Sequence, residues 1–256
     1  MLIDTHCHLY DEKFDDIDGV IERAKENDVE KIICAGCDIP SCEKVLEIAE
    51  KYDCVYACVG IYPQFIDCYD DEVEEKLEDM AKHSKVVGIG EIGIDYGYET
   101  SREKQKEAFL RQIRLAKKLG LPVVIHARDA YGDAVNFLKD NKSDIFTGTF
   151  HCFTGSKELA KEIVKLGFFI SIGGVSTFDN AKNVKEMVAS VPLENLILET
   201  DSPYLSPSPM RGKINEPSYV KYVAQGLAKI KNIDEKLVEK ITTENAFNLF
   251  NLGGNK

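Results

Sequence analysis

The sequence lacks a long hydrophobic run, a signal-peptide pattern and an excess of basic residues. No apolar run approaches the roughly 20 residues that a membrane-spanning helix needs, which excludes that class of protein. Met1–Asp4 reaches a charge at once and lacks the basic stretch and apolar core of a signal peptide, so we expect a cytoplasmic protein. The net charge of −12 argues against a broad DNA-coating surface. It does not exclude a small site where metal ions supply the positive charge.

The sequence also lacks a second cysteine pair with zinc-finger spacing. Cys34 and Cys37 form a C-x₂-C pair, but no second C-x₂-C or H-x₃-H pair follows among the eight cysteines. Cys34 lies in an apolar, strand-like run. We therefore interpret the cysteines as buried free thiols rather than metal ligands, which suits a reducing compartment.

Short apolar runs alternate with longer amphipathic segments along the whole chain, which predicts strands alternating with helices. The predicted strands are Leu2–Thr5, Lys31–Ala35, Val55–Val59, Val86–Ile89, Pro122–Ile125, Thr147–Phe150, Phe168–Ile172 and Asn195–Leu198. The predicted helices are Ile17–Asn27, Cys42–Lys51, Glu72–Ala81, Glu103–Leu119, Asp133–Asn141, Lys157–Leu166, Lys182–Ala189, Tyr219–Lys231 and Asp234–Phe250. Asp15 or Asp16 is expected to cap the first helix, and Ser156 the sixth.

Strands joined by helices pair in parallel, because parallel neighbours need a crossover connection. Eight such repeats predict an α/β fold, a (β/α)₈ TIM barrel, as a single domain over residues 1–256. An open, doubly wound sheet is the alternative. Against a nucleotide-binding version of that sheet, the chain has no G-x-G-x-x-G or Walker-type loop, and Gly88–Glu91 is too short for one.

Four of the five histidines, with two carboxylates, follow predicted strands. His6 and His8 form an H-x-H pair after the first strand, a weak signal when taken alone. The other four residues of this pattern are Glu91, His126, His151 and Asp201. The carboxyl ends of barrel strands converge on one face, where active sites lie, so we expect all six side chains to meet there. The fifth histidine, His83, is interpreted as a surface residue.

Four imidazoles and two carboxylates are too many ligands for one tetrahedral zinc ion. They suit two divalent ions with open positions for water and substrate. Nitrogen and oxygen ligands without thiolate favour Zn²⁺, Mn²⁺, Co²⁺ or Fe²⁺, and Mg²⁺ is not excluded.

At these residues the sequence resembles the TatD-type metal-dependent deoxyribonucleases of the amidohydrolase superfamily, almost from end to end. The motifs that carry the resemblance are Asp4–His8, Gly90–Tyr96, His126–Ala130, His151–Gly155, Glu199–Leu205, Arg211–Lys213 and Asn215–Pro217. The resemblance implies that His6, His8 and Asp201 hold one metal ion and that His126 and His151 hold the other. It further implies that Glu91 bridges the two ions.

The sequence departs from the family pattern at two positions. The family's Gly-x-His-Pro motif reads Gly60-Ile61-Tyr62-Pro63, so Tyr62 replaces a histidine. The segment that usually ends in Arg-Asn-Glu-Pro has Ile214 in place of that arginine. Neither change removes an implied metal ligand, but both bear on how substrate is held.

Three residues are candidates for contacting substrate. Arg128 lies two residues beyond His126 and could clamp a phosphate, with a structural ion pair to Asp129 or a neighbouring residue as the alternative. Arg211 lies on the loop after the last strand, which can form one wall of the site. Tyr62, like Tyr96 and Tyr204, could stack on a base, although ordinary packing is the alternative for each.

Together these observations predict a metal-dependent hydrolase that cleaves DNA phosphodiester bonds, with Asp201 and Glu91 as catalytic residues and Asp201 accepting a proton from the attacking water. The resemblance implies removal of nucleotides from a 3′ end, with single-stranded DNA preferred. The protein is expected to act as a monomer without a membrane partner. Two alternatives stay open: hydrolysis of a small phosphate ester, lactone or amide, and a non-catalytic metal-binding barrel.

Overall fold

The computed structural model describes residues 1–253, and its centre is an eight-stranded parallel sheet in which the strand order follows the chain. The strands are β1 (Leu2–Cys7), β2 (Val29–Ala35), β3 (Val55–Val59), β4 (Val86–Asp95), β5 (Val123–Arg128), β6 (Gly148–Phe150), β7 (Phe169–Ile172) and β8 (Leu196–Leu198). An isolated parallel bridge between Cys7 and Ser202 links the two ends of the sheet. The Thr5 hydroxyl reinforces this link by donating to the Leu198 carbonyl over 2.8 Å.

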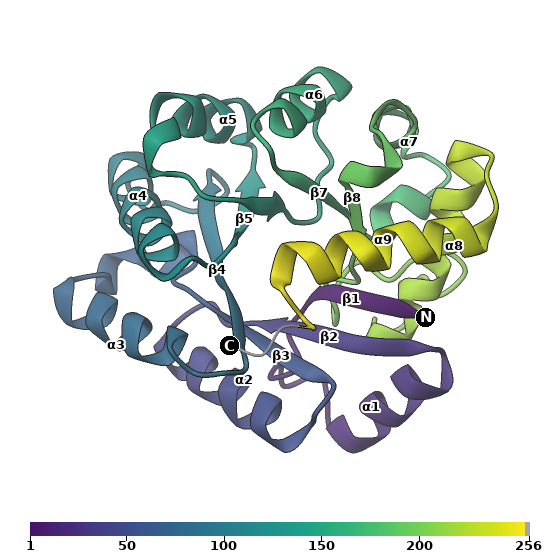
Figure 1. The fold of residues 1–256 in the computed structure, drawn as a ribbon, viewed down its shortest axis with the longest axis horizontal. Helices are drawn as coiled ribbons and strands as arrows, with labels where there is room; N and C mark the ends of the chain where they lie inside the picture. Colours follow the sequence, from purple (N-terminus) through teal and green to yellow (C-terminus); the bar gives the residue numbers. More distant parts are fainter. Residues whose placement is uncertain (254–256) are drawn as a thin grey trace.

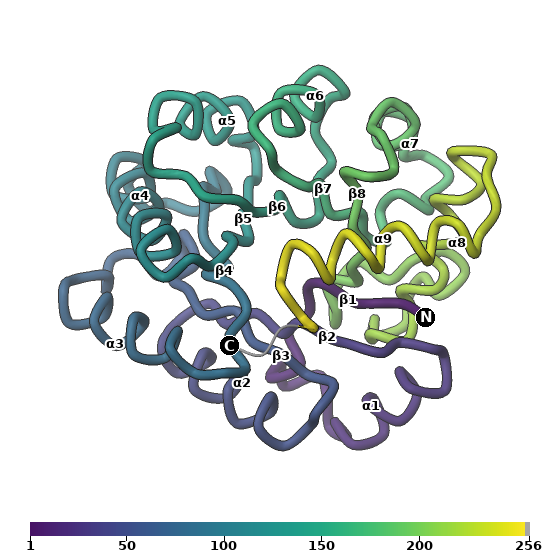
Figure 2. The backbone as a smooth tube through the Cα atoms, in the orientation of Figure 1, coloured from purple at the N-terminus to yellow at the C-terminus, as the bar shows by residue number. Residues whose placement is uncertain are grey.

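The sheet therefore curls into a nearly closed barrel, as the ring of strands in Figure 2 shows. The predicted (β/α)₈ barrel is confirmed, and the open, doubly wound alternative is wrong. The predicted domain of residues 1–256 includes three residues, 254–256, that lie outside the described part of the chain.

The helices surround the barrel (Figure 1). They are α1 (Ile17–Glu26), α2 (Ile39–Lys51), α3 (Asp71–Ala81), α4 (Arg102–Leu119), α5 (Tyr131–Asp140), α6 (Lys157–Lys165), α7 (Lys182–Ser190), α8 (Val220–Lys231) and α9 (Glu235–Phe250). The Asp16 side chain caps α1 by accepting a hydrogen bond from the Gly19 amide, and Ser156 caps α6, so both predicted caps are confirmed. Within residues 1–253, no helix is both long and apolar enough to cross a membrane.

Helix α9 differs from the others, because it crosses one end of the barrel instead of flanking a strand (Figure 1). Its residues Leu249 and Phe250 belong to a buried apolar cluster with Ile33, Val87 and Val124 from the strands. Burial of such side chains stabilises the fold by about 1.5–3 kcal/mol each. The helix closes the amino-terminal end of the barrel, which leaves the carboxyl-terminal end free for a site.

Strand β4 is longer than the sequence pattern predicts. It continues from Val86 to Asp95 because its second half pairs with β5, ending with Asp95 opposite Arg128. Glu91 consequently lies within the strand rather than after it. The extension also brings Asp95 level with the end of β5, beside His126.

All eight cysteines are free thiols, as predicted. Cys34 is buried, but Cys68 is exposed, so the expectation that the thiols are all buried is wrong. The pattern predicted burial from strand periodicity, whereas Cys68 ends a short 3₁₀ helix, Pro63–Cys68, at the surface.

Candidate metal centre

Six side chains meet at the carboxyl-terminal end of the barrel, as the sequence predicts. They are His6 from β1, His8 from the loop after β1, Glu91 from β4, His126 from β5, His151 from the loop after β6, and Asp201 from the loop after β8. Two backbone hydrogen bonds join the loops after β1 and β8: the His8 amide donates to the Ser202 carbonyl (2.7 Å) and the Asp201 amide to the His6 carbonyl (3.0 Å). These bonds place residues almost 200 positions apart in sequence side by side.

The four imidazoles form two close pairs with Glu91 between them. The Nε2 atoms of His6 and His8 lie 3.2 Å apart, and His126 Nδ1 lies 3.0 Å from His151 Nε2. One Glu91 oxygen, Oε2, faces the first pair at 3.4 Å and 3.6 Å. The other, Oε1, lies 2.9 Å from each nitrogen of the second pair. One carboxylate thus presents a different oxygen to each pair.

Asp201 joins the first pair. Its Oδ1 lies 3.5 Å from His8 Nε2 and 3.8 Å from His6 Nε2. These three side chains offer ligand atoms that all lie within 4.8 Å of one another, a spacing at which one ion could bind them together.

Two of the imidazoles are oriented from behind by hydrogen bonds, and a third, His151, lies beside a buried carboxylate without a hydrogen bond to it. His8 Nδ1 lies 3.0 Å from the Ala35 carbonyl, and His126 Nε2 lies 3.1 Å from Asp95 Oδ2. His151 Nδ1 lies 3.5 Å from Oε1 of the buried Glu199. Hydrogen-bond partners such as the Ala35 carbonyl and Asp95 fix the tautomer and ring orientation of metal-binding histidines.

This orientation tests whether the residues present fit a metal. A neutral imidazole has one N–H and one lone pair. Because His8 and His126 donate their outer N–H groups to Ala35 and Asp95, their inner nitrogens present lone pairs to the centre. The neighbouring nitrogen of each pair, His6 Nε2 or His151 Nε2, meets that lone pair with an N–H in the metal-free protein, and would turn its own lone pair to a shared ion when one is bound. The nitrogen and carboxylate donors therefore fit divalent ions.

Both central carboxylates are held in the ionised form. Burial alone would raise the pKa of Glu91, but the charge of His151 and hydrogen bonds from the imidazoles hold this pKa well below its usual range. Burial acts on Asp201 in the same direction, and there the hydrogen bond from His8 and the nearby imidazoles lower the pKa. These two buried carboxylates, beside four imidazoles, attract cations strongly to the centre.

A cavity of about 530 Å³ opens over this centre. Besides site residues it is lined by Tyr10, Asp11, Cys37, Tyr62, Gln64, Phe65, Tyr98, Arg128 and Tyr204. Arg128 is exposed at the cavity and, within residues 1–253, forms no salt bridge, so the structure does not support the alternative of an ion pair with Asp129 or a neighbouring residue. Tyr62 lines the cavity, and its hydroxyl also donates to Asp95 Oδ2 over 2.7 Å.

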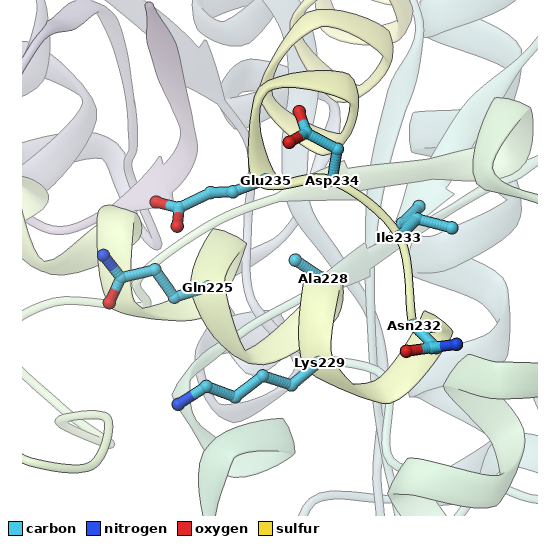
Figure 3. Close-up of a pocket in the computed structure, with 7 residues that line it drawn as sticks. All are labelled: Gln225, Ala228, Lys229, Asn232, Ile233, Asp234 and Glu235. Carbon is cyan, nitrogen blue, oxygen red and sulfur yellow. The ribbon is translucent and has the colours of Figure 1, made fainter.

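Arg211 is not brought to this cavity. It is exposed on the loop after β8, and its guanidinium stacks over the Phe178 ring at 3.9 Å. Another cavity lies at the turn between α8 and α9, where the side chains point in several directions instead of converging (Figure 3). None of its lining residues is a histidine, so it does not compete as a metal centre.

Two residues at the site were given no role by the sequence analysis. Asp95 stands in the Gly90–Tyr96 motif, and its position four residues after Glu91 on the same strand is the signal that could have identified it. Cys37 was interpreted as a buried thiol. The structure instead places Cys37 on the cavity wall with its Sγ 3.8 Å from Glu91 Oε2, and no local pattern in the sequence indicates this.

The chain is similar to known proteins over nearly its whole length. The family described as TatD related DNase matches residues 3–251. A Bacillus subtilis protein named as the metal-dependent hydrolase YabD is 46% identical over 98% of this chain and 100% of its own length. The Escherichia coli K12 protein named as the metal-dependent hydrolase YcfH is 34% identical over 100% of this chain and 97% of its own. The crystal structure of YJJV, a TatD homolog from Escherichia coli K12, has a TM-score of 0.92 at 31% identity and covers 98% of both chains.

The family match and these relatives extend over nearly the whole chain, including every residue of the candidate centre. The chain therefore belongs to the TatD related DNases, a family of metal-dependent hydrolases.

Proposed function

We propose that the centre holds two divalent metal ions. His6, His8 and Asp201 bind one ion, His126 and His151 bind the other, and Glu91 bridges them. The observation that carries this proposal is that Glu91 presents Oε2 to the first histidine pair and Oε1 to the second. Nitrogen-rich ligation favours Zn²⁺, Mn²⁺, Co²⁺ or Fe²⁺ over Mg²⁺.

We propose DNA as the substrate, cleaved at phosphodiester bonds from the 3′ end, with single-stranded DNA preferred. The family description supports a DNA substrate. The guanidinium of Arg128, which forms no salt bridge within residues 1–253, lies at the cavity and matches a phosphate. The rings of Phe65 and Tyr204 are 36% and 43% exposed at the same cavity, and exposed rings of this kind stack on unpaired bases.

Each catalytic residue has a separate task in this proposal. When bound, the metal ions polarise the phosphoryl group and the attacking water. Asp201, ionised and beside the first histidine pair, accepts the proton of that water. Glu91 fixes the separation of the two metal positions. Arg128 and Tyr62 orient the phosphate at the cavity, and Arg211, outside the cavity, contacts a phosphate further along the strand.

A small phosphate ester, lactone or amide is the second candidate. The net charge of −12 favours it, because a strongly acidic protein repels a polyanion at long range. The cavity volume of about 530 Å³ also suits a small ligand.

The test is hydrolysis by metal-reconstituted protein of single-stranded DNA, duplex DNA and small phosphoesters. Oligonucleotides labelled at the 3′ or the 5′ end establish the direction of cleavage. Chelation should abolish turnover while the far-UV circular dichroism stays native, since the barrel has its own apolar core. Turnover of small esters alone would replace DNA by the second candidate, and loss of fold on chelation would make the metals structural.

We further propose that the protein is a single-domain monomer of the cytoplasm. The eight free thiols support this compartment, since disulfides are rare there.

A further inference from the structure

Cys37 is held in place by its main chain. It lies two residues after β2, next to the cap of α2. Its amide donates to the Ser41 hydroxyl over 2.9 Å, and its carbonyl accepts from the Tyr62 amide over 2.8 Å. Asp38 and Ser41 form a capping box at the start of α2, which fixes this turn. The position of Cys37 is therefore set by bonds that do not involve its thiol.

The thiol faces the metal centre. Its Sγ lies 3.8 Å from Glu91 Oε2, the oxygen that also faces the His6 and His8 pair. Cys37, His8 and Glu91 offer three ligand atoms within 4.8 Å of one another. The three atoms are a thiol sulfur, an imidazole nitrogen and a carboxylate oxygen, all common ligands of zinc.

The other cysteines near the ends of β1 and β2 are directed elsewhere. Cys7 Sγ donates to the Ile33 carbonyl over 3.5 Å, and Cys34 Sγ accepts from the Leu9 amide over 3.2 Å. Among residues 1–253, no other cysteine belongs to a cluster with metal-ligand spacing.

We propose that Cys37 Sγ is an additional ligand of the metal ion held by His6, His8 and Asp201. As the metal–sulfur bond forms, the thiol proton is released to solvent and the sulfur binds as thiolate. This inference rests on the proposed metal centre but not on DNA as the substrate.

A thiolate ligand changes which metals the centre prefers. Thiolate is a soft ligand that favours Zn²⁺ and Co²⁺ over Mg²⁺ and Mn²⁺, which prefer oxygen. We therefore expect Cys37→Ser to lower the affinity for Zn²⁺ more than the affinity for Mn²⁺. If Cys37 only donates a hydrogen bond to Glu91, the two affinities change alike.

The direct test is titration of the metal-free, full-length protein with Co²⁺, followed by absorption spectroscopy. Cobalt–thiolate bonds give an intense near-ultraviolet charge-transfer band, whereas nitrogen and oxygen ligands give visible d–d bands. The parent protein should show both, and Cys37→Ser should lose only the near-ultraviolet band. Cys54→Ser is the matched control, because Cys54 is also partly buried but precedes β3 at the opposite end of the barrel.

Each outcome has a separate meaning. Visible bands without the near-ultraviolet band in the parent protein would overturn the proposal while leaving the metal centre intact. Absence of all cobalt bands would remove the metal centre and this proposal together. Both bands without cleavage of DNA would leave the proposal standing and reject only the substrate.

If the Cys37→Ser variant does not fold, a second measurement on the parent protein tests the same proposal. Mass spectrometry of the alkylated parent protein gives the modification rate of each thiol. Zn²⁺ should slow alkylation of Cys37 but not of Cys54, and equal Cys37 rates with and without Zn²⁺ would contradict ligation.

Discussion

His126 Nε2 lies 3.1 Å from Asp95 Oδ2, on the side of the ring that faces away from Glu91. Burial would raise the pKa of Asp95, but hydrogen bonds from His126 and Tyr62 lower it, so the carboxylate is ionised. The ring therefore keeps its proton on Nε2 and presents Nδ1 to the metal centre. This contact makes Asp95 the residue that orients His126.

Asp95→Asn should weaken metal binding at the His126 and His151 position by roughly 10- to 100-fold, the usual cost of losing a partner behind a metal ligand. An amide has no charge to hold the Nε2 proton. Isothermal titration with Zn²⁺ measures the loss. Tyr62→Phe, which keeps the Asp95 carboxylate, should cost less, and equal costs would assign the orientation to both residues together.

Metal affinity should rise with pH through the neutral range. Burial lowers the pKa of His8, His126 and His151, but contacts with Asp201, Asp95 and Glu91 respectively outweigh it and raise each pKa above the ordinary value of about 6.5. The imidazoles of the metal-free centre therefore hold their protons to a higher pH than free imidazoles do, and a bound ion must displace these protons.

The increase of metal affinity with pH is tested by measuring how much added Zn²⁺ raises the unfolding temperature at each pH. Protonated imidazoles stabilise the metal-free fold below about pH 6.5, the pKa of a histidine in the unfolded chain. This stabilisation disappears as the pH rises through the raised pKa values of the folded protein. The stabilisation by Zn²⁺ should consequently grow with pH. A thermal shift that is constant from weakly acidic to weakly alkaline pH would contradict the predicted pH dependence.

Asp201→Asn should retain substantial metal and still bind single-stranded DNA but cleave it at least ~10²-fold more slowly, the low end for loss of a general acid–base group. Asparagine keeps the shape of the side chain but removes its charge and basicity. Single-turnover cleavage of end-labelled oligonucleotides, with metal content measured in parallel, tests this. Near-parental cleavage with both ions bound would remove Asp201 as the base.

Arg128→Ala should lower kcat/KM on DNA by roughly 10- to 100-fold, since a hydrogen bond to a charged group contributes about 1.5–3 kcal/mol. Hydrolysis of a small neutral ester should change much less. Arg211→Ala serves as the comparison, with a smaller loss on a short oligonucleotide because this side chain stacks on Phe178 outside the cavity. Equal losses from Arg128→Ala on DNA and on the ester would indicate a structural role near His126.

Much of the fold could be predicted from the sequence because its signals are local. Apolar runs of strand length and helical periodicity are read within a few residues, and all eight strands and nine predicted helices lie within residues 1–253, close to their expected bounds except at β4, which is six residues longer than predicted. Side chains that follow parallel strands share one face of the barrel, so His126 and His151 could be placed together before any contact was known.

Only the tertiary structure decided how these side chains face one another. Asp201 reaches His8 from a left-handed backbone conformation (φ 57°), in a turn held by its amide bond to the His6 carbonyl. Cys37 reaches Glu91 because a helix cap and Tyr62 hold its main chain. Loop conformations and ring orientations depend on partners far away in the chain, and no local pattern of residues encodes them.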